Sequence, residues 1–348
     1  MQKERIIFIY PNLFTFIKTE RKLLSTDYEI ISINQNWTNK FLLPLNLLHQ
    51  LIFLLFNVKK VNTILVSFGG YWSFLPALFG KIFNKKVAIV VHGTDCVSFP
   101  EINYGNLSKP LMRWFTKKSY QLASIILPVS KSLVYTENNY YCDRTLKFGY
   151  SFHLDNINTP YKIIPNGLII KDWNRNANII RDKKSFITVL SEGKIILKGV
   201  DLIIEVASKF PNHNFYLAGI DNLETFKNVE NIYCLGKLTP KELNLWYSKT
   251  QFYLQLSNTE GFGVAICEAM LCNCIPIVSD VNHLPTIIGD SGFVLMKRNS
   301  NMLVDLINVA LKSDISDLEQ KARKRIVNNF SVENRQRLLI KELLSEEK

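Results

Sequence analysis

The sequence predicts an α/β protein with two doubly wound, Rossmann-like parallel-sheet domains that face each other across a cleft. Its 348 residues give room for two domains, at ~100–200 residues each. Short apolar, β-rich runs alternate with helical patterns along the chain, which is typical of parallel sheets covered by helices. One polar, asparagine-rich stretch, residues 166–184, interrupts this alternation.

The first series of strands reads as nearly continuous apolar runs, as expected for strands buried on both faces. The predicted strands are Arg5–Tyr10, Glu29–Ile33, Thr63–Ser67, Val87–Val91, Ser124–Pro128 and Lys162–Pro165. Helical patterns between them include Trp72–Phe83 and Lys109–Leu122.

A second series begins after the polar stretch. Its predicted strands are Phe186–Leu190, Asn214–Ala218, Asn231–Leu235, Phe252–Leu256 and Ile275–Val278. Its predicted helices are Val200–Phe210, Pro240–Ser248 and Gly263–Leu271.

These patterns predict four segments. Residues 1–167 form an N-terminal domain, and residues 168–184 form a linker. Residues 185–330 form a C-terminal domain, and residues 331–348 contain a helix expected to pack back on the N-terminal domain. Ligands of such sheets bind at the carboxyl ends of the strands.

The positive charge is concentrated in the first half of the chain. The whole sequence has a net charge of +12, with 42 basic and 30 acidic residues. Residues 1–170 carry 19 basic and 9 acidic residues, a net of +10, whereas the remainder carries 23 and 21. Such a half suits nucleic acid, an anionic membrane surface or an anionic substrate.

The longest apolar stretch, Phe41–Phe56, predicts a buried or interfacial helix. As a helix it would span ~24 Å, which is shorter than a ~30 Å hydrocarbon core. No secretory signal is apparent, because a first strand follows the N-terminus directly. The six cysteines lack metal-ligand spacing, so reduced cysteines in a cytoplasmic protein are expected.

Two common nucleotide-binding motifs are missing. No G-x-G-x-x-G follows the first strand, where the turn is Tyr10–Leu13, and no G-x-x-x-x-G-K-[ST] occurs. Ordinary Rossmann dehydrogenases and P-loop NTPases are therefore not expected.

The stretch Ser257–Ala269 carries the strongest candidate site. Gly261 and Gly263 let backbone N–H groups approach an anion at the start of a helix. The carboxylates of Glu260 and Glu268 flank this position and can accept hydrogen bonds from sugar or ribose hydroxyls. This arrangement suits a nucleotide sugar. The alternative interpretation is a capped helix with incidental acids.

This stretch resembles the E-x7-E signature of retaining GT-B glycosyltransferases, in particular glycosyltransferase family four (glycosyl transferases group one). The resemblance continues over most of residues 60–330. It includes the segments His92-Gly93-Thr94-Asp95, Val129-Ser130, Pro165-Asn166-Gly167, Lys198-Gly199-Val200-Asp201 and Glu268-Ala269-Met270 with Pro276-Ile277-Val278.

The resemblance implies that residues 1–167 are the acceptor-side domain and residues 185–330 the nucleotide-sugar-binding domain. It also implies a role for each matching residue. Glu268 would bind the donor ribose, and Glu260 would contact the transferred sugar. The backbone of Phe262–Val264 would serve the diphosphate and sugar, with Gly261 and Gly263 beside it. Lys198 would neutralise the diphosphate leaving group, where charge develops in the transition state.

His92 is expected near the reacting sugar as a catalytic residue; the alternative is a hydrogen-bonded loop histidine. Asp95, Asn12 and Ser130 are expected on the acceptor side of the cleft. No metal site is expected, and no DxD motif is apparent.

The sequence departs from the family pattern at several positions. Lys194 stands near the place of the family's arginine, in a segment one residue shorter, and offers a point charge rather than a bidentate fork. Asn273 replaces a common glycine, and Thr286 replaces a common glutamate.

The expected activity is retaining transfer of a hexose from a UDP- or GDP-sugar to a glycan acceptor. The acceptor is expected to be lipid-linked, in bacterial surface polysaccharide synthesis such as lipopolysaccharide or capsule. The basic half indicates a peripheral protein on the inner face of the cytoplasmic membrane, with an anionic membrane surface as partner and no nucleic acid. A sugar epimerase or phosphorylase, and a non-catalytic nucleotide-sugar-binding subunit, are the alternatives.

Overall fold

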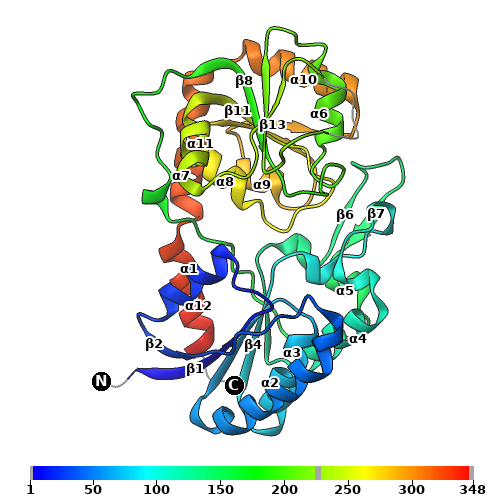
Figure 1. Ribbon diagram of the computed structural model, residues 1–348, viewed down its shortest axis with the longest axis vertical. Coiled ribbons are helices and arrows are strands. Elements are labelled where there is room, and N and C mark those ends of the chain that lie inside the picture. Colours follow the sequence, from blue (N-terminus) through cyan, green and yellow to red (C-terminus); the bar gives the residue numbers. More distant parts are fainter. Residues whose placement is uncertain (1–2, 224–228, 345–348) are drawn as a thin grey trace. The chain divides into compact units, whose positions relative to one another are not determined.

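The computed structural model describes residues 3–223 and 229–344. The chain forms two compact units (Figure 1). Unit 1 comprises residues 1–136, 147–165 and 333–348, and unit 2 comprises residues 137–146 and 166–332. The family recognition predicts two parallel-sheet domains, and the structure confirms this fold class with two all-parallel sheets.

Unit 1 is built on a five-stranded sheet of order β2-β1-β3-β4-β5. Its strands are β1 (Glu4–Ile9), β2 (Tyr28–Ile31), β3 (Thr63–Ser67), β4 (Lys86–Val91) and β5 (Ile125–Pro128). The strands β3 and β4 are almost entirely buried, because helices cover both faces of the sheet. The strand order reverses between β1 and β3, which is where ligands of such sheets bind.

The helices of unit 1 lie on the two faces of this sheet (Figure 1). One face carries α1 (Thr15–Leu24) and α12 (Val332–Leu344), and the other carries α2 (Leu43–Asn57), α3 (Tyr71–Ile82) and α4 (Pro110–Leu122). The short helix α5 (Tyr150–His153) lies in the segment 147–165 of the unit. The chain's last helix therefore belongs to the same unit as its first strand.

A buried ion pair fastens α12 to α1. The Arg335 guanidinium donates to Glu20 at 2.8 Å, and both side chains are 5% exposed. Arg335 also donates to the backbone carbonyls of Ile164 and Pro165. Removing one partner of such a pair leaves an uncompensated buried charge, so this contact holds the C-terminal helix in unit 1.

Unit 2 is built on a six-stranded sheet of order β10-β9-β8-β11-β12-β13. Its strands are β8 (Asp182–Val189), β9 (Asn214–Ala218), β10 (Ile232–Cys234), β11 (Thr250–Gln255), β12 (Ile275–Ser279) and β13 (Phe293–Leu295). The order reverses between β8 and β11, as in a dinucleotide-binding Rossmann sheet. The stacked rings of Phe215, Phe186 and Phe252 cross the three central strands.

Helices cover both faces of this sheet as well (Figure 1). They are α6 (Val200–Ala207), α7 (Pro240–Lys249), α8 (Val264–Leu271), α9 (Leu284–Ile288), α10 (Ser300–Lys312) and α11 (Ile315–Asn329). The helix α7 begins with a reciprocal capping box between Thr239 and Glu242.

The predicted elements differ from the structure in several places, of which three concern strands. Lys162–Pro165 is not a regular strand; Tyr161 forms an isolated bridge to Ile126 instead. The small β6 (Thr136–Asn138) and β7 (Leu146–Phe148) pair was not predicted, because each strand is only 3 residues long. The strand β8 begins at Asp182, four residues before the predicted start. The prediction missed these four residues because all of them are polar.

Candidate active site

Two loops that follow neighbouring strands of unit 2 carry the predicted donor residues. The first, between β8 and α6, contains Lys194 and Lys198, and the second, between β11 and α8, contains Glu260. Because β8 and β11 are the strands between which the sheet order reverses, both loops lie at the position where such sheets bind nucleotides.

Backbone contacts fix these two loops against each other. The N–H of Asn258 donates to the Leu197 carbonyl at 2.9 Å, and its side-chain amide donates to Ile196 at 2.7 Å. Gly199 has φ +68°, and a Cβ there would lie 2.1 Å from the Leu256 carbonyl oxygen. Only glycine allows this approach, so the K-G-x-D turn can pack directly on the end of β11.

This packing brings the Lys198 ammonium to the Glu260 carboxylate. Lys198 Nζ lies 2.6 Å from Glu260 Oε2, and the two side chains are 23% and 16% exposed. The same oxygen accepts hydrogen bonds from Gln255 at 3.0 Å and Ser257 at 3.3 Å. The pair is thus preorganised and still reachable from solvent.

Asn282 holds the Glu260 loop from the neighbouring strand. Its side-chain oxygen accepts from the Glu260 N–H at 2.9 Å and from the Thr259 hydroxyl at 3.1 Å. Asn282 follows β12 and adopts φ +51°, a left-handed conformation that asparagine tolerates better than most residues. Nothing in the sequence singles out Asn282, although polar residues just after the strands of a parallel sheet are candidates by position.

The helix α8 begins where the predicted anion site ends. Gly263, at φ +101°, is its N-cap residue, and the first helical residue is Val264. The N-terminus of a helix presents backbone N–H groups and a positive dipole end, which favour phosphate. The Phe262 ring is 2% exposed and packs near His283 and Phe330. Phe262 therefore offers its backbone, not its ring, to a ligand.

Glu268 lies further along α8, and burial raises its pKa to about 8. Within residues 3–223 and 229–344, no hydrogen bond to its carboxyl group is present. A partly buried carboxyl group without a protein partner is a candidate for ligand hydroxyl groups. These observations do not test which ligand group Glu268 binds, so its assignment to the ribose stays a prediction.

His92 directly follows the strand β4 of unit 1 and packs between aromatic rings. Its ring centroid lies 4.4 Å from that of Phe68 and 4.9 Å from that of Phe16. Its Nε2 lies 2.8 Å from the hydroxyl of Ser67, the last residue of the neighbouring strand. Burial, followed by the charge of Arg335, lowers the His92 pKa well below its usual value. The imidazole is therefore neutral at physiological pH.

Asp95 holds the turn that presents His92. The carboxylate accepts from the N–H groups of His92, Gly93 and Gly69, and from the Tyr120 hydroxyl at 3.0 Å. The side chain is completely buried, and burial raises its pKa while these hydrogen bonds oppose the increase. The carboxylate is occupied by protein donors, which fits a positioning role.

The other two residues predicted on the acceptor side follow strands of the same sheet. Asn12 is exposed after β1, and its side chain accepts from the Leu13 N–H at 2.7 Å. Ser130 is buried after β5, with its hydroxyl 2.9 Å from that of Ser132. Asn12, His92 and Ser130 thus share the carboxyl edge of the unit 1 sheet.

The departures from the family pattern have different local settings. Asn273 adopts φ +65°, the conformation for which the family's glycine is suited. Thr286 lies within α9, where its carbonyl accepts from Arg325 at 2.7 Å. Lys194 lies in the turn before Lys198, and its carbonyl accepts the Lys198 N–H. Across the described ranges, no group of three or more His, Cys, Asp or Glu residues could hold a metal ion.

A comparison with family models identifies the domain that carries these loops. Residues 171–330 match the model of glycosyl transferases group 1. These residues form a group 1 glycosyltransferase domain. The match confirms the recognition made from the E-x7-E and K-G-x-D segments, both of which lie inside it.

One curated relative matches more of the chain than the group 1 domain, and another matches a shorter part. Protein CapJ of Staphylococcus aureus is 23% identical over 82% of this chain and 73% of its own length. O-antigen chain mannosyltransferase B of Escherichia coli is 31% identical, over 24% of this chain and 21% of its own length.

Solved structures share the fold over the whole chain. Sucrose-phosphate synthase from Thermosynechococcus elongatus has a TM-score of 0.75 at 13% identity, covering 98% of both chains. HepE from Anabaena in complex with UDP and glucose has a TM-score of 0.67 at 13% identity, covering 99% of this chain and 100% of that chain. The predicted GT-B fold is confirmed.

Proposed function

We propose that this group 1 glycosyltransferase transfers a hexose, with retention of anomeric configuration, from a nucleoside diphosphate sugar to a glycan. The observation that carries the proposal is the Lys198–Glu260 pair beside the N-terminus of α8. It combines a cation for phosphate, a carboxylate for sugar hydroxyls and a helix end that favours anions.

The donor would be held along the unit 2 loops. The diphosphate lies against the backbone of residues 261–264 and the Lys198 ammonium, with Lys194 as a second cation. Glu268 accepts hydrogen bonds from the two ribose hydroxyls, and Glu260 from hydroxyls of the transferred sugar. When phosphate arrives, the Lys198 ammonium is shared between it and the Glu260 carboxylate, which remains held by Gln255 and Ser257.

The reaction breaks the bond between the sugar C1 and the diphosphate oxygen. Its electron pair goes to the leaving diphosphate, where Lys198 and the α8 N-terminus stabilise the developing charge. The acceptor hydroxyl forms the new bond to C1 on the same face, and its proton passes to a leaving phosphate oxygen. The neutral His92 imidazole hydrogen-bonds the reacting sugar, with its orientation set by Ser67 and Asp95.

We further propose that the acceptor is a lipid-linked glycan of a bacterial surface polysaccharide, such as lipopolysaccharide or capsule. The similarity to O-antigen chain mannosyltransferase B of E. coli supports this acceptor class. The net charge of +10 in residues 1–170 suits an anionic membrane surface at the cytoplasmic face. No helix within the described residues is long and apolar enough to cross a membrane.

The test is transfer from labelled UDP- and GDP-sugars to lipid extracts and glycans, followed by analysis of the anomeric configuration of the product. The proposal expects a retained configuration and a large loss of turnover for Lys198→Ala, Glu260→Ala and Glu268→Ala. Unchanged turnover in all three variants would contradict the site. Epimerised donor or dependence on free phosphate would instead identify an epimerase or a phosphorylase, and nucleotide binding without turnover would identify a binding subunit.

A further inference from the structure

The helix α2 of unit 1 is apolar on two faces. Its sequence, LPLNLLHQLIFLLFN, contains no charged residue. On one face, Gln50 and Leu54 are buried, and the Gln50 amide donates to the Trp72 carbonyl of α3 at 3.0 Å. That face accounts for the packing of α2 on α3, but the opposite face is also apolar.

The second face forms a stripe of large exposed side chains, which we call the α2 stripe. Its members recur at helical spacing on α2 and the turn before it: Phe41, Leu45, Leu48, Ile52, Leu55 and Phe56. Phe41 is 93% exposed and Phe56 is 71% exposed. Single exposed apolar residues are ordinary, whereas a continuous stripe of this kind marks an interaction surface.

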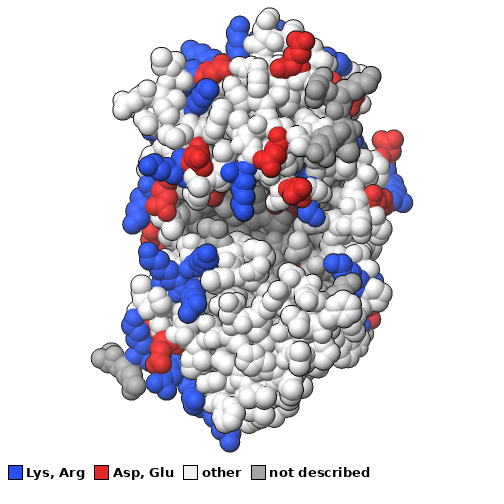
Figure 2. Space-filling model, in the orientation of Figure 1, with Lys and Arg blue, Asp and Glu red and all other residues white. Residues whose placement is uncertain are grey.

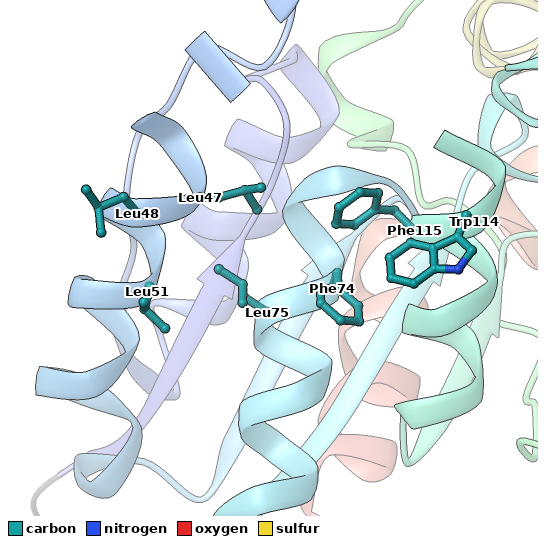
Figure 3. Close-up of a pocket in the computed structure, with 7 residues that line it drawn as sticks. All are labelled: Leu47, Leu48, Leu51, Phe74, Leu75, Trp114 and Phe115. Atoms are coloured by element: carbon teal, nitrogen blue, oxygen red, sulfur yellow. The ribbon is translucent and has the colours of Figure 1, made fainter. Parts of the chain in front are cut away.

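An apolar groove beside the stripe extends this surface to α3 and α4. The groove has a volume of about 280 Å³. Its walls include Leu47 and Leu51 of α2, Phe74 and Leu75 of α3, and Trp114 and Phe115 of α4 (Figure 3). The side chains of Leu51 and Leu75 point toward each other across it (Figure 3). Such a lining fits hydrocarbon and offers nothing to a polar ligand.

The charged residues on these three helices are all basic. The helices α2, α3 and α4 contain no Asp or Glu, and their charged residues are Lys81, Arg113, Lys117 and Lys118. The exposed Lys59 and Lys60 follow α2 directly. Figure 2 shows the surface over α2 and α3 almost free of charged side chains. An apolar centre with basic residues at its ends matches an anionic bilayer, where acyl chains lie beneath phosphate groups.

We propose that the α2 stripe inserts into the outer part of an anionic lipid bilayer and that the α2–α4 groove receives a lipid hydrocarbon chain. Lys59, Lys60 and Lys81 contact the lipid phosphates. This proposal rests on the proposed function, since it gives a lipid-linked acceptor a defined membrane-facing surface on unit 1. It assigns the membrane contact to particular residues of α2, a helix that would lie parallel to the membrane surface.

Vesicle flotation with the full-length protein tests the stripe. Vesicles of phosphatidylcholine alone are compared with vesicles in which part of it is replaced by phosphatidylglycerol, at low and high salt. The double variant Leu45→Gln/Phe56→Gln should bind anionic vesicles at least about tenfold more weakly, because two large side chains no longer leave water. The matched control, Ile180→Gln/Val309→Gln, changes two exposed apolar residues of unit 2 and should bind like the original protein.

A second pair of variants tests the charge. Lys59→Gln/Lys60→Gln should weaken binding to anionic vesicles and reduce its dependence on salt, because each basic residue near the surface adds a screened attraction. The control is Lys183→Gln/Lys184→Gln, an adjacent exposed pair in unit 2. Equal weakening by the control would show that total charge, not this surface, governs binding, and would overturn the proposal.

Fluorescence tests the groove itself. Trp114 is 48% exposed and lines the groove. Phosphatidylcholine brominated on its acyl chains, mixed with phosphatidylglycerol, should quench part of the tryptophan emission. Trp114→Phe should abolish that part. Identical quenching in both proteins would place the hydrocarbon elsewhere and overturn the groove assignment.

Three further outcomes separate the alternatives. Protein that stays unbound to every vesicle overturns the proposal. Dimers in sedimentation velocity that become monomers in Leu45→Gln/Phe56→Gln assign the stripe to a second copy of the chain and also overturn it. Thermal shifts by UDP- and GDP-sugars test unit 2 separately. Lost vesicle binding with intact donor binding rejects only the membrane surface, and the reverse result rejects the proposed function.

Discussion

Lys198 Nζ lies 2.6 Å from Glu260 Oε2, between two loops that follow the strands at which the unit 2 sheet reverses its order. The pair is partly exposed, so solvent screens it and its contribution to folding is small. Its value lies in preorganisation, because a fixed cation next to a fixed carboxylate needs no rearrangement when charge develops on a leaving group.

Lys198→Ala should lower kcat by ~10²–10³-fold, with a smaller change in KM, because the lysine acts mainly on charge that develops in the transition state. Steady-state kinetics with the accepted donor measures both constants. Lys321→Ala is the control, since it removes an ion-paired lysine, 2.8 Å from Asp317, elsewhere in unit 2. A loss confined to KM would instead indicate a ground-state binding role.

The affinity for nucleotide should rise with pH and level off above about pH 8. Burial raises the pKa of the Glu268 carboxyl group to about 8, so it is protonated at neutral pH in the free protein. Ribose hydroxyls that donate to this group favour its ionised form, and binding then releases a proton. Affinity should therefore increase by up to about tenfold per pH unit below pH 8.

Isothermal titration calorimetry of UDP or GDP in buffers of different ionisation enthalpy counts the released proton. Glu268→Gln has no such proton, so its binding should be weaker and should lose this part of the pH dependence. The same slope in the variant would assign the proton to another group and contradict the ribose role of Glu268.

Glu268→Gln should also stabilise the free protein, and increasingly so at higher pH. A carboxyl group whose pKa is raised in the folded state contributes stability below its ordinary pKa and loses it as pH rises to the folded value. For Glu268 this loss covers the window from 4.5 to about 8. The neutral amide avoids it. Thermal melts should show a Tm advantage for the variant that grows across this window and then stays constant.

Asn282 should act as a positioning residue for Glu260. Asn282→Gly retains the left-handed backbone, at φ +51°, but removes the oxygen that accepts from the Glu260 N–H and the Thr259 hydroxyl. We expect kcat to fall by about tenfold, the effect of losing ~1–1.5 kcal/mol of orientation. Asn282→Asp keeps the acceptor oxygen and should recover much of the rate. Equal kcat values for the Asn282→Gly variant and the original protein would contradict this role.

The sheets were predictable because their central strands are continuous apolar runs. Thr63–Ser67 and Asn214–Ala218 match the structure residue for residue. The first residues of β8 are polar, and only pairing with both neighbours makes them a strand. The elements outside the predicted set include α9, β13, α10 and α11, besides β6 and β7. The helices α10 and α11 have N-cap residues, but these elements contain no functional motif.

The sequence predicted those residues of the candidate site that belong to one short, recognisable segment. Glu260 and Glu268 share such a segment, and Lys198 belongs to a recognisable turn. Asn282 and Gln255 depend instead on contacts between loops that only the sheet order brings together. Asp95 shows the opposite case. Its motif marks it as important, but its burial turns it toward the protein and away from any ligand.

Asp95→Ala should destabilise unit 1 by several kcal/mol and disorder the turn that presents His92. The substitution leaves the buried N–H groups of Gly69 and Gly93 and the Tyr120 hydroxyl without their hydrogen-bond acceptor. Each unsatisfied buried group costs ~1–3 kcal/mol. Tyr120→Phe removes only one donor and should cost ~1 kcal/mol. Urea unfolding measures both free energies. If Asp95 acts only through this turn, the rate of Tyr120→Phe should remain near that of the original protein. A large loss of rate in that folded variant would show instead that the hydroxyl takes part in the reaction.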